Sequence, residues 1–167
     1  MRSTFLHLAA VALVAAAPAL HAQQSTYTDP QQRYTLLVPP GWRAEPQGGG
    51  VSLLNGPAYA SVIRVPGQGA PKSLVEALAQ RFPAQWQNFA GSSAGDAQFG
   101  GRPGAYGWFT GINPRGAEAV LKVVATVDGD SGYAMMISAP RADFPKYKQD
   151  LERIEAGFRL TAGAGGR

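Results

Sequence analysis

Apolar and polar residues alternate along much of the chain, which is the pattern of β-strands with one face on a hydrophobic core. The alternation, interrupted by Gly, Pro, Asn and Asp, predicts strands at residues 33–38, 42–44, 51–54, 58–65, 96–99, 105–112, 117–127 and 133–139. Asn55-Gly56-Pro57 predicts a hairpin turn between two of these strands. Turns at residues 113–116 and 128–132 join the last three strands into a meander.

The strands of this meander carry apolar side chains on both faces. Leu121 and Val123 alternate with Val120 and Val124, and the segment at residues 133–139 repeats the pattern. A strand that is apolar on both faces belongs to a sheet that is covered on both sides.

Two segments have the apolar spacing of amphipathic helices. The first begins with a capping box, Ser73 and Glu76, and Pro83 is expected to kink or split the helix near Phe82. Its apolar stripe is interpreted as core packing, not as a ligand site. The stripe consists of Leu74, Leu78, Phe82, Trp86 and Phe89.

A loop of Gly, Ser and Ala is expected at residues 90–95, before the later strands. The second helix is expected to be capped by Asp143, with Pro145 in its first turn and an apolar stripe from Phe144 to Phe158. The order hairpin, helix, meander, helix predicts an α+β fold, with a mainly antiparallel sheet covered by helices on both faces.

Residues 1–22 have the layout of a secretory signal peptide. A basic start precedes an apolar run that ends at Pro18, and a cleavage site after Ala22 leads into polar residues. A second possible cleavage site lies near Ala19. The alternative is an uncleaved membrane anchor, but the run is shorter than the roughly 20 residues that a span requires. No cysteine follows the run, so we expect no lipoprotein.

Cleavage of 22 residues from 167 leaves 145, which is the length of one domain. The expected organisation is a single domain at residues 23–160 and a disordered tail at 161–167. The mature protein is then periplasmic or secreted, with no membrane span.

The predicted mature chain contains neither histidine nor cysteine. Its two histidines, His7 and His21, lie in the predicted signal peptide, and the chain has no cysteine. This excludes Ser-His-Asp and Cys-His catalysis, thiol redox chemistry and zinc sites of the usual type. We therefore expect a protein without enzymatic activity, metal or cofactor. Loss of Arg2 leaves 14 Lys+Arg against 11 Asp+Glu, dispersed along the chain, so no nucleic-acid partner is expected.

The order of elements and their turns resembles a known group. A Tyr-Thr-Leu-Leu-Val-Pro-Pro-Gly-Trp segment (residues 34–42) opens the domain, and a Gly-Gly-Arg-Pro-Gly turn (100–104) precedes the closing hairpins and helix. The domain from Tyr27 to Leu160 is similar to the PsbP-like and DcrB-like superfamily of small α/β/α sandwich proteins. The resemblance implies this fold and an accessory or binding role in the envelope. It transfers no active-site residue.

Two polar segments of the sequence are candidates for a functional site. Asp128-Gly129-Asp130-Ser131-Gly132 resembles the start of a calcium loop, but the sixth position is Tyr133 and the twelfth is Ala139, where Gly and Glu are needed. We interpret it as a turn between strands. Glu118 lies on a strand between apolar neighbours, and paired with a second acid it would support a carboxylate-dependent hydrolase acting on an envelope or extracellular substrate.

The third candidate is an apolar groove on the strand at residues 105–112. Tyr106 and Trp108 share one face, while the other face carries Ala and Gly apart from Phe109. A face of small residues either admits a helix at close range or leaves space for a ligand. The sequence therefore predicts Tyr106, Trp108 and Phe109 as binding residues for an envelope protein, a peptide or a lipidic ligand. The main hypothesis is a non-catalytic accessory protein, and the hydrolase is the alternative.

Overall fold

The computed structural model describes residues 24–66 and 69–161. The predicted signal peptide lies outside the described residues, and so does the predicted tail apart from Thr161. The Thr161 N–H donates a hydrogen bond to the carbonyl of Arg33, at 2.9 Å.

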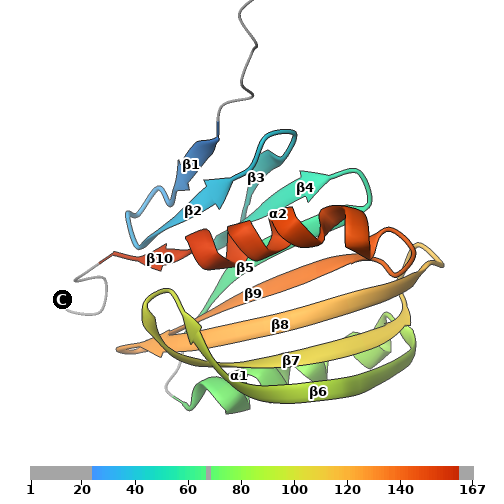
Figure 1. Cartoon of the computed structure of the whole chain (residues 1–167). Coiled ribbons are helices and arrows are strands. Elements are labelled where there is room, and N and C mark those ends of the chain that lie inside the picture. Colours follow the sequence, from blue (N-terminus) through green and yellow to red (C-terminus); the bar gives the residue numbers. More distant parts are fainter. Residues whose placement is uncertain (1–23, 67–68, 162–167) are drawn as a thin grey trace, which may run out of the picture.

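A seven-stranded antiparallel sheet forms most of the protein, in the order β3-β4-β5-β9-β8-β7-β6. A three-stranded antiparallel sheet has the order β1-β2-β10. Figure 1 shows the two sheets and the helix α2, which crosses in front of β5 and β9. The strands are β1 (Ser25–Thr28), β2 (Tyr34–Val38), β3 (Arg43–Gln47), β4 (Gly50–Asn55), β5 (Ala58–Pro66), β6 (Gln87–Phe99), β7 (Arg102–Ile112), β8 (Glu118–Asp128), β9 (Ser131–Pro140) and β10 (Arg159–Leu160).

These elements confirm an α+β fold with mainly antiparallel pairing. The helices are α1 (Pro71–Ala79), a 3₁₀ turn (Phe82–Ala84) and α2 (Phe144–Gly157). The predicted second helix is confirmed, with Asp143 at its N-cap and a proline in its first turn, although the Asp143 side chain makes no capping hydrogen bond.

The predicted first helix is wrong in two respects. Its N-cap is Ala70, with Pro71 at the first position, and no side chain makes a capping hydrogen bond, so the Ser73 capping box does not form. The break that Pro83 predicts near Phe82 is present, because α1 ends at Ala79 and a 3₁₀ turn covers Phe82–Ala84, but the chain then continues as β6 and not as a helix. Trp86 and Phe89 still pack in the same core, from outside the helix.

The loop predicted at residues 90–95 is also wrong, because these residues belong to β6. Pairing with β7 overrides their weak strand propensity. Two aromatic rings of β7 lie over glycines of β6: a methyl group on Gly95 would come within 3.1 Å of the Tyr106 ring, and one on Gly91 within 3.7 Å of Phe109. Such rings cover the backbone that glycine leaves exposed in a strand.

Two hydrophobic clusters lie on opposite sides of the large sheet. Val123 and Val124 are successive residues of β8, so their side chains point to opposite faces. Val124 packs in a cluster that includes Leu151 and Ile154 of α2, here called the α2-side cluster. Val123 packs in a cluster that includes Val75 of α1, here called the α1-side cluster. Each face of the sheet is named after the cluster on it.

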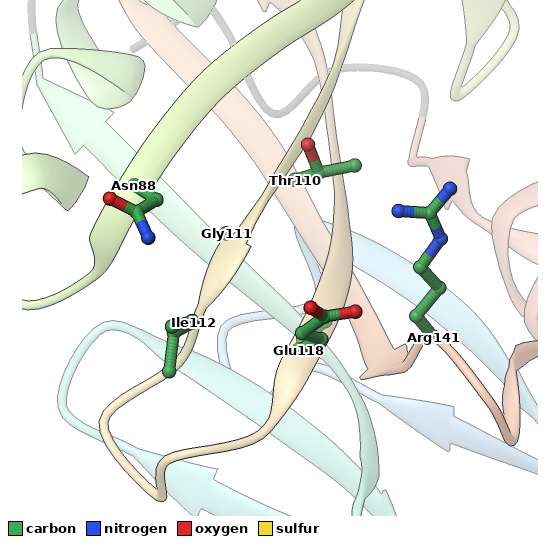
Figure 2. Close-up of a pocket in the computed structure, with 7 residues that line it drawn as sticks. Asn88, Thr110, Gly111, Ile112, Glu118 and Arg141 are labelled. Carbon is green, nitrogen blue, oxygen red and sulfur yellow. The ribbon is translucent and has the colours of Figure 1, made fainter.

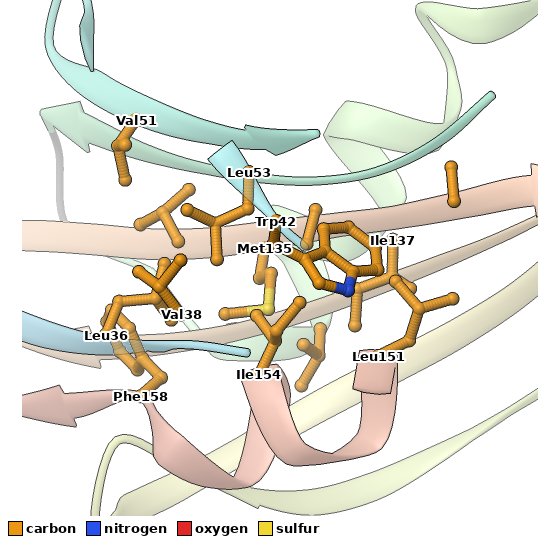
Figure 3. Packing of buried hydrophobic residues seen from close by; sticks show 14 of the residues in the cluster. Leu36, Val38, Trp42, Val51, Leu53, Met135, Ile137, Leu151, Ile154 and Phe158 are labelled. Atoms are coloured by element: carbon orange, nitrogen blue, oxygen red, sulfur yellow. The ribbon is translucent and has the colours of Figure 1, made fainter. Parts of the chain in front are cut away.

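The α2-side cluster is the larger of the two, and Figure 3 shows its packing between the small sheet, the large sheet and α2. Trp42, which follows the Pro-Pro-Gly corner, closes one end. It is 7% exposed, its indole N–H donates to Asp150 at 3.1 Å, and its ring meets Tyr147 edge to face at 6.3 Å. Phe158 forms another part, with its ring stacked on Phe99 at 4.3 Å.

Candidate functional site

The two faces of β7 have different surroundings. On the α1-side face, small residues let α1 approach closely: a methyl group on Gly107 would come within 3.2 Å of Val75 and 2.8 Å of Phe109. Phe109 lies on this face and stacks on Phe89 with ring centroids 5.1 Å apart. Tyr106 and Trp108 lie on the α2-side face, so the sheet separates Phe109 from the other two predicted binding residues.

Trp108 is half-buried beside the N-terminal turn of α2. Its ring meets Phe144 edge to face, with centroids 5.8 Å apart. The ammonium nitrogen of Lys122, directly opposite on β8, lies 5.3 Å from the Trp108 ring centroid and 5.5 Å from that of Tyr106. Both distances are within the range of a cation–π contact. One lysine therefore touches both aromatic rings.

An ion pair joins this group to α2. Lys122 Nζ donates to both carboxylate oxygens of Glu155, at 2.7 Å each. The two side chains are only 17% and 19% exposed, so solvent screens the pair less than it screens a surface pair. The pair fixes the ammonium under the rings and ties β8 to α2. The sequence carries one indication of this ion pair: Lys122 lies between Leu121 and Val123 in an otherwise apolar strand, where a charged side chain needs a partner.

A hollow of about 120 Å³ opens between α2 and the strands at this point. Its apolar lining is Trp108, Ile137, Phe144 and Leu151, and its charged lining is Lys122, Lys148, Glu152 and Glu155. Small-molecule sites usually measure about 300–1,000 Å³. The hollow is therefore sized for one apolar side chain of a larger partner.

A polar pocket of about 170 Å³ lies further along the same strands (Figure 2). Asn88, Thr110, Glu118 and Arg141 supply its polar groups. Asn88 has a φ of 51°, in the left-handed region, and lies next to a β-bulge in β6. Bulges redirect side chains and are common beside binding sites. Sequence reasoning identified Glu118 but missed Asn88 and Arg141.

Strand register places the hollow and the pocket on one continuous surface. Trp108, Lys122 and Ile137 are cross-strand partners, and two residues further on Thr110, Val120 and Ala139 are partners in the same way. From Trp108 to Ile112 the distance along β7 is about 14 Å, four residues at 3.4 Å each. We call this surface, from Tyr106 and Trp108 to Glu118, the α2-side strip.

A second charged pair lies outside the strip, in the turn between β1 and β2. Asp29 is 2% exposed and accepts hydrogen bonds from Arg33 Nε at 2.6 Å and Nη2 at 2.8 Å. These bonds hold the pKa of the Asp29 carboxyl below its usual value. Burial raises the pKa of the neighbouring Tyr34, whose hydroxyl has no hydrogen-bond partner among the described residues. The pair stabilises the turn and lines no part of the strip.

The turn between β8 and β9 is the segment that resembles a calcium loop. Asp128 forms an ion pair with Arg102, with 2.7 Å between Oδ1 and Nη2, and Gly129 has a positive φ of 57°. Among residues 24–66 and 69–161, no three Asp, Glu, His or Cys side chains gather as a metal site would need. Within the same ranges, no helix has the length and apolarity to cross a membrane.

Comparison with known proteins finds similarity in structure alone. No protein-family model matches the sequence, and no curated protein matches it. The solved structure of the cyanobacterial PsbP (CyanoP) from Synechocystis sp. PCC 6803 superposes with a TM-score of 0.63 at 14% identity, over 89% of this chain and 99% of that one. The chain has the PsbP-like fold. This confirms the fold that the sequence resemblance implied.

Two further solved structures share the fold. The Saccharomyces cerevisiae Ran-binding protein Mog1p superposes with a TM-score of 0.59 at 10% identity, over 83% of this chain and 96% of that one. LpqN of Mycobacterium tuberculosis, described as involved in cell envelope biogenesis, gives 0.52 at 15% identity, over 84% and 92%. At such low identities the PsbP-like fold is the common property.

Proposed function

We propose that this chain is a non-catalytic binding protein of the bacterial envelope or exterior, and that it holds a protein partner on the α2-side strip. The observation that carries the proposal is Trp108, a tryptophan left half-buried beside an apolar hollow of about 120 Å³. Tryptophan is enriched among the residues that dominate binding energy at protein interfaces. The Lys122–Glu155 pair holds the site in position before binding, which lowers the entropic cost of association.

Fold relatives support a binding role. Mog1p is a Ran-binding protein, and LpqN is involved in cell envelope biogenesis. Together with the predicted signal peptide, the second relative supports a periplasmic or secreted location after cleavage near Ala22. The proposal includes the finer description of the fold as an α/β/α sandwich, which the separate α1-side and α2-side clusters support.

The hydrolase alternative has less support, because a glycosidase-type site needs two carboxylates facing one substrate. Glu118 is the only acid that lines the polar pocket of the strip. Glu152 and Glu155 line the hollow, but each forms an ion pair with a lysine, at 3.7 Å with Lys148 and 2.7 Å with Lys122. Each of these carboxylates is on α2 and is paired with a lysine. We therefore interpret them as a charged rim of the hollow and not as the acid and base of a hydrolase.

The test is affinity capture of envelope proteins by the mature chain, read by mass spectrometry. Trp108→Ala is the test variant, and the control is Gln47→Ala, an exposed residue of β3 at the opposite edge of the large sheet from β6. We expect a discrete protein to be captured by the wild type and the control. Trp108→Ala should weaken its binding about 30-fold, which corresponds to about 2 kcal/mol at an interface centre. Equal capture by all three proteins would contradict the proposed surface.

A further inference from the structure

The two edge strands of the large sheet differ in how well they are protected against pairing with another strand. The edge strand β3 has five residues, contains Pro46 and carries an Arg43–Glu45 ion pair at 2.7 Å. The other edge strand, β6, has 13 residues, ten of them exposed, and contains no proline, no basic residue and one acid, Asp96. Open edges normally carry proline or charge, because their free backbone groups pair with other strands. Only β3 has this protection.

The C-terminal half of β6 is the regular part of this edge. Two bulges interrupt the pairing before Ser93, and from Ser93 to Phe99 the register with β7 is continuous. In an antiparallel pair, alternate residues point both N–H and C=O away from the partner strand. Among the described residues β6 pairs only with β7, so three or four residues of this segment present their backbone groups outward.

A hollow of about 200 Å³ lies directly beside this segment, on the α1-side face. Val75 and Ala105, each 4% exposed, form its apolar part. Glu76, Asp96 and Lys72 supply charge, and none of the three forms an ion pair within residues 24–66 and 69–161. Two carboxylates against one ammonium give the rim a local charge of −1.

The size of the edge decides between a second copy and a different partner. Seven residues at about 3.3 Å each, in a layer about 10 Å thick, offer roughly 230 Å² per molecule. A stable interface needs about 800 Å² per partner. A second copy would bring small residues that are too short to fill the hollow, and with them a second Asp96 carboxylate, which the negative rim repels. An extended segment with a long side chain fills the hollow and pairs with the backbone together.

We propose that Ser93–Phe99 of β6 binds an extended segment of a partner protein by strand addition, with a lysine or arginine side chain in the adjacent hollow. The apolar stem of that side chain lies against Val75 and Ala105, and its cationic head lies between Glu76 and Asp96. This inference rests on the proposed binding function but uses a surface separate from Trp108.

The probe is an acetylated, amidated heptapeptide of alternating threonine and valine with a central lysine, titrated into ¹⁵N-labelled mature protein. We expect amide shifts at residues 93–99 and 72–76, with dissociation constants in the millimolar range. A peptide with glutamate at the centre should bind about tenfold more weakly. A lysine peptide that is N-methylated on every backbone nitrogen should not bind, because neither of its edges then has an N–H group to donate to β6.

Variants test the charged rim. The double variant Glu76→Gln, Asp96→Asn should remove the preference for lysine over glutamate, and Glu45→Gln on the β3 edge is the matched control that keeps it. Trp108→Ala should leave peptide binding unchanged. The proposal of a partner on the α2-side strip and the proposal of a peptide at β6 can therefore fail independently. The proposal is overturned if about 5 mM lysine peptide shifts no β6 amide. It is equally overturned if β6 shifts depend on protein concentration without peptide, since the occupant is then a second copy.

Discussion

The two faces of β7 differ in what packs against them, although Trp108 and Phe109 are both half-buried. On the α1-side face, Gly107 allows α1 to approach and Phe109 stacks on Phe89. On the α2-side face, α2 packs over β2, β5 and β9 and meets the half-buried Trp108 through Phe144. Both faces carry large aromatic residues. The position of the helices, and not residue type, therefore decides which hydrophobic cluster each aromatic ring of β7 joins.

The largest expected effect on stability comes from removing the buried ring of Trp42. Trp42→Ala should lower the free energy of unfolding by about 3–5 kcal/mol, since it leaves a cavity in the α2-side cluster and leaves Asp150 without its indole donor. Chemical denaturation measures this. A loss below about 1 kcal/mol would show that the corner after β2 is not packed as described.

Phe109→Ala should lower the free energy of unfolding by about 2–4 kcal/mol, because Phe109 packs with Phe89 in the α1-side cluster. Partner capture by the folded variant should stay unchanged, since the ring does not line the α2-side strip. Selective loss of capture at full stability would reverse the assignment of the two faces.

Asp29→Asn should lower the free energy of unfolding by about 1–2 kcal/mol, because the charged hydrogen bonds from Arg33 are weakened. Since the pKa of Asp29 is lowered in the folded state, its contribution is present above the unfolded pKa of about 3.9 and is lost as the pH falls through the folded pKa. Urea denaturation across acidic pH should show this loss in the wild type and a reduced one in Asp29→Asn. Identical pH profiles would show that the pair is not formed.

Trp108→Ala is expected to have the smallest effect on stability, about 1 kcal/mol or less. The ring loses its contacts with Phe144 and Lys122 but leaves no enclosed cavity. Chemical denaturation of both variants compares the two sites directly: Trp42→Ala should lose more unfolding free energy than Trp108→Ala, because Trp42 is buried and Trp108 is half-buried. Equal losses would place Trp108 in the core.

Local sequence patterns were sufficient for the meander and for α2. Strand alternation with clear turn residues predicts β7, β8 and β9, and the apolar spacing from Phe144 to Phe158 predicts α2. The stripe from Leu74 to Phe89 was misleading. Its spacing fits a helix, yet Pro83 and the pairing of β6 divide it among a helix, a 3₁₀ turn and a strand.

The site was only partly predictable, because its elements come from distant parts of the chain. Strand alternation correctly places Tyr106 and Trp108 on one face of β7. Phe109 faces the other cluster, and that depends on which face α1 covers, which alternation alone does not specify. The contacts of Trp108 with Phe144, and of Lys122 with Glu155, join β7 and β8 to α2. No spacing within a single segment indicates such contacts.

The most direct measurement is the oxidation rate of the chain's three tryptophans, followed residue by residue by mass spectrometry, with and without the captured partner. Trp42 and Trp86 are 7% and 6% exposed, whereas Trp108 is half-buried on the α2-side strip. The account predicts that Trp108 oxidises first in the free protein and becomes protected by the partner, while the rates at Trp42 and Trp86 stay low in both states. A Trp108 rate as low as the other two, or one that the bound partner does not change, would contradict it.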